Sequence, residues 1–260
     1  MSGALRIVVV GAGNVGTKLS QRLCDQGCRP FQIYSRSPRQ NCDGIPVVLR
    51  MEEIFPHADL YLIAVPDDSI AAVAELLSQN ISTEAFVVHT SGSTPSTVLA
   101  PYFRRYGVCY PLQTFSTGRV PDFNEIPICI YAPSKEDLKY LKQVGNILSA
   151  SVHVLDDKQR AQVHLAAVFV NNFVNYLYHT GYQLLKEDDL PFELLIPLIK
   201  ETAAKVQPEA DPAWFQTGPA KRGDEKTILR HLDALQKYPE LKDLYEHLTR
   251  AIQTTHQKQI

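Results

Sequence analysis

A glycine-rich loop near the start of the chain is the feature that most constrains its fold. The apolar run Arg6–Val10 leads directly into Gly11-Ala12-Gly13-Asn14-Val15-Gly16, and a helical pattern follows. In such a loop the first glycine permits a tight turn, the second lets the backbone approach a pyrophosphate, and the third lets the helix pack closely on the strand. The helix N-terminus adds N–H donors and partial positive charge. The pattern predicts a dinucleotide-binding site; the alternative is a strand–helix turn without a ligand.

The composition is typical of a globular protein of one or two domains. The chain has 260 residues, a net charge of −2 and 45% hydrophobic residues. It contains no basic run that would indicate nucleic-acid or anionic-membrane binding, and no apolar stretch long enough to cross a membrane. Because no secretory signal pattern opens the chain, we expect a cytoplasmic protein. The cysteines show no metal-ligand spacing, so we expect reduced thiols and no metal site. They are Cys24, Cys28, Cys42, Cys109 and Cys129.

The alternation of strand-like and helical segments predicts an α/β fold with a doubly wound, mostly parallel sheet. Eight short β-rich runs occur up to about Leu155, and helices are predicted between them. The predicted strands are Arg6–Val10, Phe31–Tyr34, Pro46–Leu49, Leu60–Val65, Phe86–His89, Val108–Tyr110, Ile128–Tyr131 and Val152–Leu155. The predicted helices are Val15–Gln26, Asp68–Gln79, Thr97–Tyr106 and Lys135–Leu148.

Beyond Asp156 only helices are predicted. They cover Asp157–Leu185, Phe192–Val206, Glu225–Gln236 and Leu241–Gln257, with Asp156 or Asp157 as the N-cap of the first. We therefore expect a nucleotide-binding α/β domain over residues 1–156 and an all-α domain over residues 157–260.

The turn after the second strand indicates which dinucleotide binds. NAD-specific sites carry a carboxylate about 20 residues past the glycine loop. Ser35, Arg36 and Ser37 occupy that turn, and it contains no acid. A guanidinium and two hydroxyls suit the extra phosphate of NADP, which a carboxylate would repel. We predict NADP(H) as the cofactor; the alternative is that Arg36 is a solvated turn residue.

The strands predicted over Leu60–Val65 and Phe86–His89 are followed by Pro66-Asp67-Asp68 and Thr90-Ser91-Gly92-Ser93. Both segments are expected at the carboxyl edge of the sheet, where doubly wound folds bind ligands. We expect Val65 and Pro66 beneath the nicotinamide and Thr90 beside the cofactor. His89, Thr90 and Ser91 are expected to line the substrate cleft. The alternative for Ser91-Gly92-Ser93 is an ordinary turn.

A stripe of polar residues interrupts the mostly apolar helix that begins at Asp157. His164, Asn171, Asn175 and His179 fall on one face at 100° per residue, whereas the apolar remainder predicts a helix buried nearly all round. Buried imidazoles and amides need partners, so the stripe faces a wet cleft, a network between helices or a dimer interface.

A second polar segment lies near residue 220. Asp224 is predicted to cap the next helix, while Arg222 is either solvated or an anion clamp.

Several motifs in this order resemble one bacterial family over nearly the full length. They are GAGNVG, Ser35-Arg36-Ser37, His89-Thr90-Ser91-Gly92, Tyr110-Pro111-Leu112-Gln113-Thr114-Phe115, Asn171-Asn172 and Thr217-Gly218-Pro219 with Arg222-Gly223-Asp224. That family is usually labelled "putative NADP oxidoreductase" or Rossmann-like protein of unknown function. The chain is more distantly similar to pyrroline-5-carboxylate reductase, 6-phosphogluconate dehydrogenase and 3-hydroxyisobutyrate dehydrogenase. The resemblance implies a Rossmann domain, a dimerising helical domain and a cleft between them, and it names no substrate.

One position departs from the 3-hydroxyisobutyrate dehydrogenase pattern. That pattern has a catalytic lysine three residues before the first of two asparagines, where this chain has Val168. His164 lies one turn earlier and is the candidate acid/base, because imidazole titrates near neutral pH.

Together these observations predict an NADP(H)-dependent oxidoreductase acting on a small polar carbonyl, imine or hydroxy substrate. His164 supplies the proton, Asn171 and Gln113 orient the substrate, and Ser91 donates a hydrogen bond. Two alternatives stay open: a non-catalytic NADP-binding sensor, and hydride exchange with a deazaflavin.

Overall fold

The computed structural model describes residues 5–28, 30–38, 44–116, 118–119 and 121–257. The chain divides into two compact units, Met1–Tyr176 and Leu177–Ile260, which are described separately. The sheet ends before Asp156, as the sequence analysis expects, whereas the compact units divide later, within a helix. The domain limits 1–156 and 157–260 stay a prediction.

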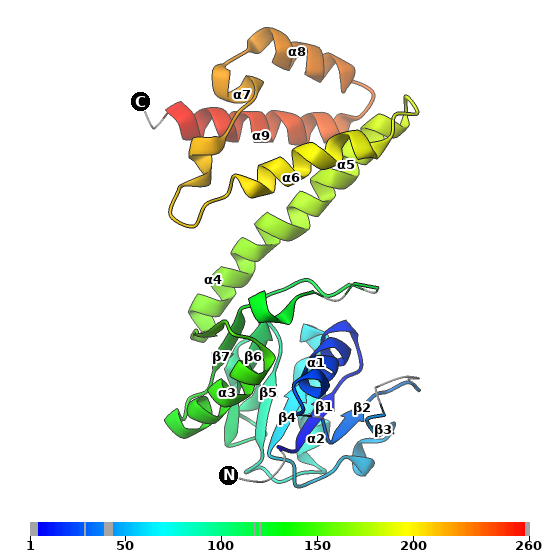
Figure 1. Cartoon of the computed structure of the whole chain (residues 1–260), viewed down its shortest axis with the longest axis vertical. Coiled ribbons are helices and arrows are strands. Elements are labelled where there is room, and N and C mark those ends of the chain that lie inside the picture. Colours follow the sequence, from blue (N-terminus) through cyan, green and yellow to red (C-terminus); the bar gives the residue numbers. More distant parts are fainter. Residues whose placement is uncertain (1–4, 29, 39–43, 117, 120, 258–260) are drawn as a thin grey trace. The chain divides into compact units, whose positions relative to one another are not determined.

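The described part of the first unit contains an eight-stranded sheet in the order β3-β2-β1-β4-β5-β6-β7-β8 (Figure 1). All neighbouring strands are parallel except β6 and β7, so the predicted α/β fold with a mostly parallel sheet is confirmed. The order reverses between β1 and β4, which is the switch point where such sheets bind ligands. The strands are β1 (Ile7–Val10), β2 (Gln32–Tyr34), β3 (Val47–Val48), β4 (Leu60–Ile63), β5 (Phe86–His89), β6 (Arg105–Pro111), β7 (Ile128–Tyr131) and β8 (Val152–Val154).

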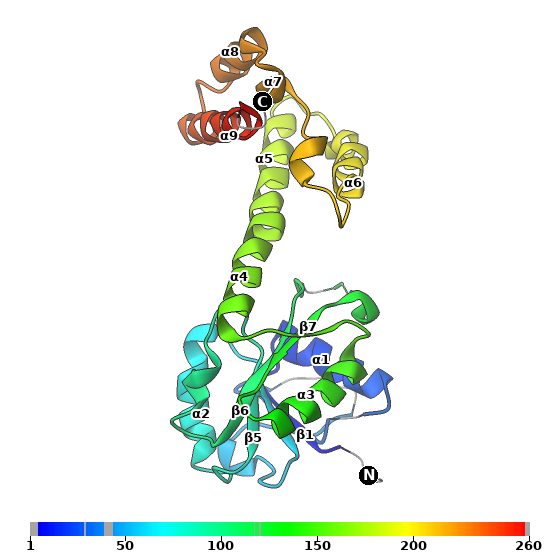
Figure 2. The same ribbon diagram turned by 90° about the vertical axis from the view of Figure 1, so that its left-hand side faces the viewer.

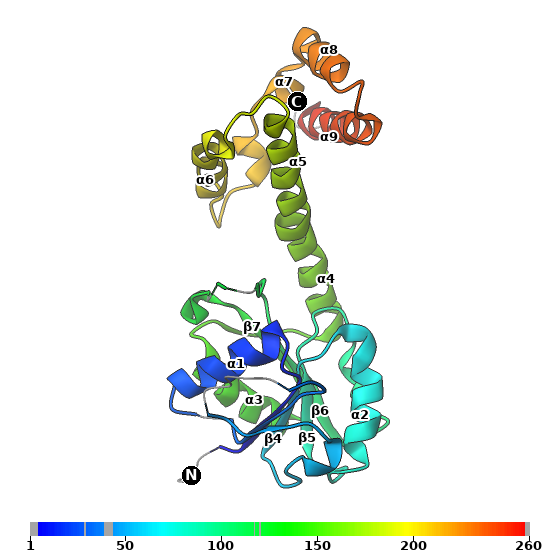
Figure 3. The same cartoon turned by 90° about the vertical axis from the view of Figure 1, so that its right-hand side faces the viewer.

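Helices cover both faces of this sheet (Figures 2 and 3). Helices α1 (Asn14–Asp25) and α3 (Lys135–Leu148) pack on one face, and α2 (Ile70–Ser78) packs on the other. Alternate residues of one strand enter the two cores: Val9 packs on the side of α1 and Val10 on the side of α2. Short 3-10 turns complete the connections. They are η1 (Met51–Glu53), η2 (Asp67–Ser69), η3 (Ser96–Leu99) and η4 (Phe123–Glu125).

One predicted helix of this unit is wrong. The segment Thr97–Tyr106 contains only part of the single 3-10 turn η3, and its last residues already belong to β6. Pro101 has no N–H to donate and its ring disfavours a continuing helix, which explains why the turn ends.

The helix beginning at Asp157 is less regular than the sequence analysis expects. It consists of α4 (Asp157–Ala167), a π-helical turn η5 (Val168–Phe173) and α5 (Val174–Lys186). Asp156 is its N-cap, with a capping box to Gln159. The expected burial is wrong for the single chain, because Phe169 and Val170 are 61% and 74% exposed. The described elements of the first unit leave these apolar side chains uncovered.

The second unit is all-helical over its described residues. It comprises the end of α5, η6 (Phe192–Leu195), α6 (Ile196–Ala204), η7 (Pro212–Phe215), α7 (Pro219–Arg222), α8 (Glu225–Ala234) and α9 (Pro239–Gln257). The predicted cap of α8 is confirmed, since the Asp224 side chain accepts from the Thr227 N–H. Among the described residues, no helix is long and apolar enough to cross a membrane.

Candidate functional site

The glycine-rich loop has the geometry that a bound pyrophosphate requires. Gly11 has φ +118°, and a Cβ there would lie 2.3 Å from the Ala64 carbonyl oxygen. A Cβ on Gly16 would lie 2.0 Å from the Gly11 oxygen, so the close approach of helix and strand needs glycine. Gly13, by contrast, faces open space: a Cβ there would meet nothing within 4 Å. No described side chain caps α1, which leaves its first N–H groups available to a phosphate.

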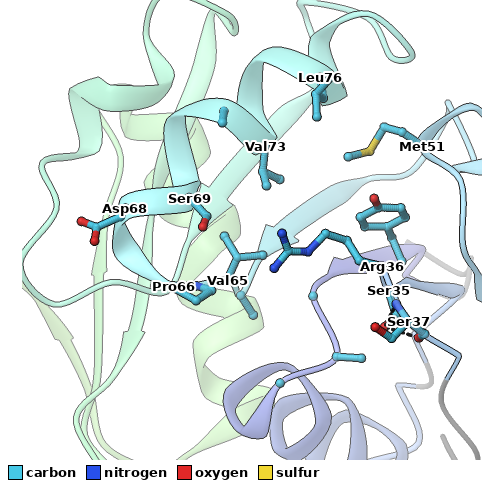
Figure 4. Close-up of a pocket in the computed structure, with 16 residues that line it drawn as sticks. Ser35, Arg36, Ser37, Met51, Val65, Pro66, Asp68, Ser69, Val73 and Leu76 are labelled. Atoms are coloured by element: carbon cyan, nitrogen blue, oxygen red, sulfur yellow. Dashed lines mark hydrogen bonds between the residues drawn. The ribbon is translucent and has the colours of Figure 1, made fainter.

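A pocket of about 400 Å³ extends from this loop along the carboxyl edge of the sheet (Figure 4). It is bounded by the glycine loop, the turn after β2, the end of β4 and α2. Of the residues predicted to bind the cofactor, those lining the pocket are Gly11, Ala12, Gly13, Ser35, Arg36, Ser37, Val65 and Pro66. The remaining wall is mostly apolar, which suits an aromatic base. It consists of Tyr34, Met51, Ala64, Asp68 and Ser69 together with Ala72, Val73 and Leu76 of α2.

Among the described residues that line this pocket, Arg36 is the one cation. Figure 4 shows its side chain reaching from the end of β2 toward Val65 and Val73, whereas the Asp68 carboxylate points away from it. Within the described part of the chain, the Arg36 guanidinium has no hydrogen-bond or ion-pair partner. Its donors are therefore free for an anion. The residues present fit a phosphorylated dinucleotide.

Four of the predicted cofactor residues, one of them from the pocket lining, have side chains with contacts within the protein. The Ser35 hydroxyl donates to the Ser37 carbonyl at 2.7 Å, which closes the turn that presents Arg36. Thr90 is nearly buried and donates to the Ile63 carbonyl at 3.4 Å. The Asn14 amide donates to the Phe115 carbonyl at 3.0 Å, so it ties the loop after β6 to the first residue of α1. Val15 packs on the core beneath the loop. Cofactor contacts from these side chains stay predictions.

A second cavity, of about 580 Å³, lies between the end of β6 and the α4–η5 segment. Three of the predicted catalytic residues, His164, Asn171 and Gln113, line it together. The lining also includes a residue that the sequence analysis did not single out, Tyr110. Its hydroxyl lies 3.2 Å from Nδ1 of His164, and the two rings meet edge to face.

Gly92 makes this tyrosine–histidine pair sterically feasible. A Cβ on Gly92 would lie 2.6 Å from Nδ1 of His164 and 2.7 Å from Cζ of Tyr110. The Ser91-Gly92-Ser93 turn therefore packs against the pair, although it does not line the cavity. Asn172 also lines the cavity, and the π-helical turn presents both asparagine amides there.

Ser91, the fourth predicted catalytic residue, uses its side chain for hydrogen bonds within its own turn and to the neighbouring Asp67. Its hydroxyl donates to the Asp67 carboxylate at 2.7 Å and accepts from the Thr94 N–H at 2.9 Å. Ser93 donates to the same carboxylate oxygen. The donor role of Ser91 toward a substrate stays a prediction, and the structure adds Asp67 as the residue that fixes this turn.

His89 does not line the cleft as expected, because its side chain is completely buried. Its Nδ1 accepts from the Ser91 N–H, which leaves Nε2 to face the Pro95 carbonyl. Burial, followed by the nearby Arg160 guanidinium, lowers the pKa of His89 to about 4. A neutral imidazole is needed for this bonding pattern, so His89 is a structural support of the turn.

The start of α4 is anchored to the same turn. Asp157 accepts from the Ser96 N–H and hydroxyl, and it pairs with Arg160 at 2.8 Å. Arg160 is buried and donates to the Thr94 carbonyl at 2.6 Å. These bonds hold α4, and with it His164, against the carboxyl edge of the sheet.

Two residues of the predicted polar stripe lie beyond η5, on the helix that follows it. Asn175 and His179 lie on α5 and are exposed. His179 stacks on Tyr182 and belongs to the second unit. Cys42 lies outside the described residues.

Comparison with known proteins agrees with this architecture. The sequence matches a Rossmann-like domain over residues 2–115 and a domain of unknown function, DUF2520, over residues 126–252. A crystal structure from Bacteroides fragilis, named as a "putative NADP oxidoreductase", is 40% identical with a TM-score of 0.87, over 96% of this chain and 98% of that one. This chain belongs to the family of that protein.

More distant structures share the fold. A protein from Thermotoga maritima is 22% identical, with a TM-score of 0.74 over 97% of this chain and 99% of that one. Pyrroline carboxylate reductase from Plasmodium falciparum, solved with NADP bound, is 15% identical, with a TM-score of 0.59 over 97% and 98%. The comparison with curated proteins found no match.

Proposed function

We propose that this protein is an NADP(H)-dependent oxidoreductase that moves a hydride between the nicotinamide and a small polar carbonyl, imine or hydroxy substrate. The observation that carries the proposal is the placement of two sites along one edge of one compact unit. The dinucleotide pocket follows β1, β2 and β4, and the Tyr110–His164 cavity adjoins the end of β6. The names of the Bacteroides fragilis relative and the Plasmodium falciparum reductase support the same activity.

Each group of residues has its own role in this reaction. The glycine loop and the N-terminus of α1 hold the pyrophosphate, and Arg36 binds the 2′-phosphate. When bound, the cofactor supplies or accepts the hydride. His164 exchanges the proton with the substrate oxygen or nitrogen, while the amides of Asn171 and Gln113 orient that atom.

Tyr110 sets the protonation pattern of His164. Burial raises the pKa of Tyr110 to about 12, so the phenol stays protonated at neutral pH. The oxygen of the protonated phenol can accept from Nδ1–H of His164, which keeps one proton on Nδ1 and leaves Nε2 to gain or lose the other as the imidazole passes between its neutral and cationic forms. Nε2 is then the atom that exchanges a proton with the substrate.

Three variants test this proposal. We expect Arg36→Ala to weaken NADPH binding about 10- to 100-fold, because a charge-assisted bond contributes about 1.5–3 kcal/mol, and to leave NADH binding unchanged. Titration by cofactor fluorescence measures both constants. Equal affinities of the wild type for NADPH and NADH would refute the assignment of Arg36.

The proposed proton transfer is tested by measuring NADPH oxidation with a panel of ketones, aldehydes and imines. The proteins compared are the wild type, His164→Ala and Tyr110→Phe. We expect His164→Ala to abolish turnover and Tyr110→Phe to lower kcat at least tenfold, with NADPH binding near normal in both. Unchanged turnover of His164→Ala would remove that residue from the mechanism.

The second candidate function is a non-catalytic NADP sensor. It is favoured by one observation: Val168, at the position where a lysine serves 3-hydroxyisobutyrate dehydrogenases, lines the cavity. Saturable NADPH binding without oxidation by any compound of the panel would support this alternative.

We also propose a homodimer formed through the helices that follow residue 156. The exposed apolar side chains of α4 and η5, among them Phe169 and Val170, favour it. Light scattering coupled to gel filtration measures the mass, and a monomer at micromolar concentration would refute this proposal.

A further inference from the structure

We infer that the Tyr110–His164 cavity takes an uncharged substrate, a carbonyl or imine compound without a carboxylate or phosphate group. This inference rests on the proposed function and narrows its substrate class.

The first argument is the chemistry of the lining. Among the described residues, the cavity is lined by no lysine, arginine, aspartate or glutamate. Its polar groups are one phenol, one imidazole, one hydroxyl and three amides, and the rest is aliphatic. The lining residues are Tyr110, Leu112, Gln113, Thr114, Val163, His164, Ala166, Ala167, Val168, Val170, Asn171 and Asn172. Removing a carboxylate from water without a cationic partner is costly, whereas amides and hydroxyls pair well with a carbonyl group.

The second argument is that the charged groups behind the cavity are already paired. Asp67 and Arg160 are close enough to Tyr110 to influence its pKa. Arg160 is 1% exposed, forms an ion pair with Asp157 and donates from Nη2 to the Thr94 carbonyl, while its buried Nε has no hydrogen-bond partner among the described residues. Asp67 accepts from two serine hydroxyls. Neither side chain lines the cavity, so neither meets a charged group of a substrate bound there.

The third argument is the environment of the tyrosine itself. The pKa of Tyr110 rises chiefly because burial penalises the phenolate. The same surroundings penalise a carboxylate placed beside the tyrosine–histidine pair.

Val168 offers a way to reverse this preference. It lines the cavity and is partly exposed, so a longer side chain has room to enter. Val168→Lys introduces a cation, and Val168→Met introduces an uncharged chain of similar length as the matched control. Thermal melts confirm that both variants are folded.

The experiment compares each 2-oxo acid with its methyl ester and primary amide, and a cyclic imine with its carboxylated form. We expect the wild type to use the uncharged member of each pair with at least tenfold higher kcat/KM. Val168→Lys shifts the acid-to-amide ratio at least tenfold toward the acid, while Val168→Met leaves this ratio within threefold. A wild type that prefers the acids overturns the inference, as does a ratio that moves equally in both variants.

Binding separates this inference from the proposed function. The hydroxy amide and the hydroxy acid of each pair are titrated into the protein saturated with NADP⁺ by calorimetry. If the hydroxy amide binds but no compound is turned over, the inference of an uncharged site stands and the proposed oxidoreductase function is refuted. Tighter binding of the hydroxy acid, or no binding of either at 10 mM, about the weak limit of specific ligands, refutes the inference.

Discussion

The buried imidazole of His89 gives the clearest test of how this site is built. In the folded protein its pKa is about 4, against 6.5 ordinarily, because the ring is buried and lies near Arg160. Between these values the unfolded chain binds a proton that the folded chain does not. The stability that depends on neutral His89 is therefore complete above pH 6.5 and is lost as the pH falls toward 4. A difference of roughly 2.5 pH units corresponds to about 3 kcal/mol of unfolding free energy.

Urea unfolding at a series of pH values from 4 to 8 measures this loss. The matched variant is His89→Gln, whose amide can accept from the Ser91 N–H but does not titrate. We expect the variant to be less stable at pH 7, and the wild type to lose about 3 kcal/mol more than the variant between pH 7 and 4. Carboxylates such as Asp157 titrate in both proteins, so the difference between the curves isolates the imidazole. Parallel curves would refute the assignment of His89 as a neutral support of the Ser91 turn.

Three further predictions concern the framework of the two sites. Gly16→Ala should cost about 1–3 kcal/mol in urea unfolding because its methyl group meets the Gly11 carbonyl, whereas Gly13→Ala should change stability by less than about 0.5 kcal/mol and weaken NADPH binding. Equal stability of the two variants would contradict this reading of the loop. Arg160→Met should destabilise the protein by about 1–3 kcal/mol, since Asp157 and the Thr94 carbonyl lose a partner, and a neutral result in thermal unfolding would show that Arg160 is dispensable. Asp156→Ala should remove the capping box of α4 at a cost of about 1 kcal/mol; an unchanged urea midpoint would show that the cap contributes nothing.

Local patterns predicted most elements of the first unit accurately. The strands Phe86–His89 and Ile128–Tyr131 and the helix Lys135–Leu148 match the predicted limits. Their signals are local: a continuous apolar run marks a buried strand, and Ser134 caps the helix. The helix predicted over Thr97–Tyr106 is wrong because Pro101 disfavours a continuing helix after η3 and the chain then enters β6.

The π-helical turn and the exposure of the helix around it could not be predicted in this way. A regular 100° spacing was assumed from Asp157 onward, but η5 changes that spacing at Val168. The predicted burial of this helix follows from its apolar composition, but composition alone does not indicate which surface covers a helix. Phe169 and Val170 are exposed in the single chain for that reason.

The sequence by itself determined the cofactor pocket. The glycine loop shapes the pocket through its own backbone. The topology of a parallel sheet brings the ends of β1, β2 and β4 to one edge, whichever side chains lie between them. Only the tertiary structure decided what lies beside that pocket. Tyr110 meets His164 across 54 positions of the chain, because bonds from Asp157 and Arg160 hold α4 against the turn after β5. Such contacts depend on where two elements cross, which no spacing in the sequence encodes.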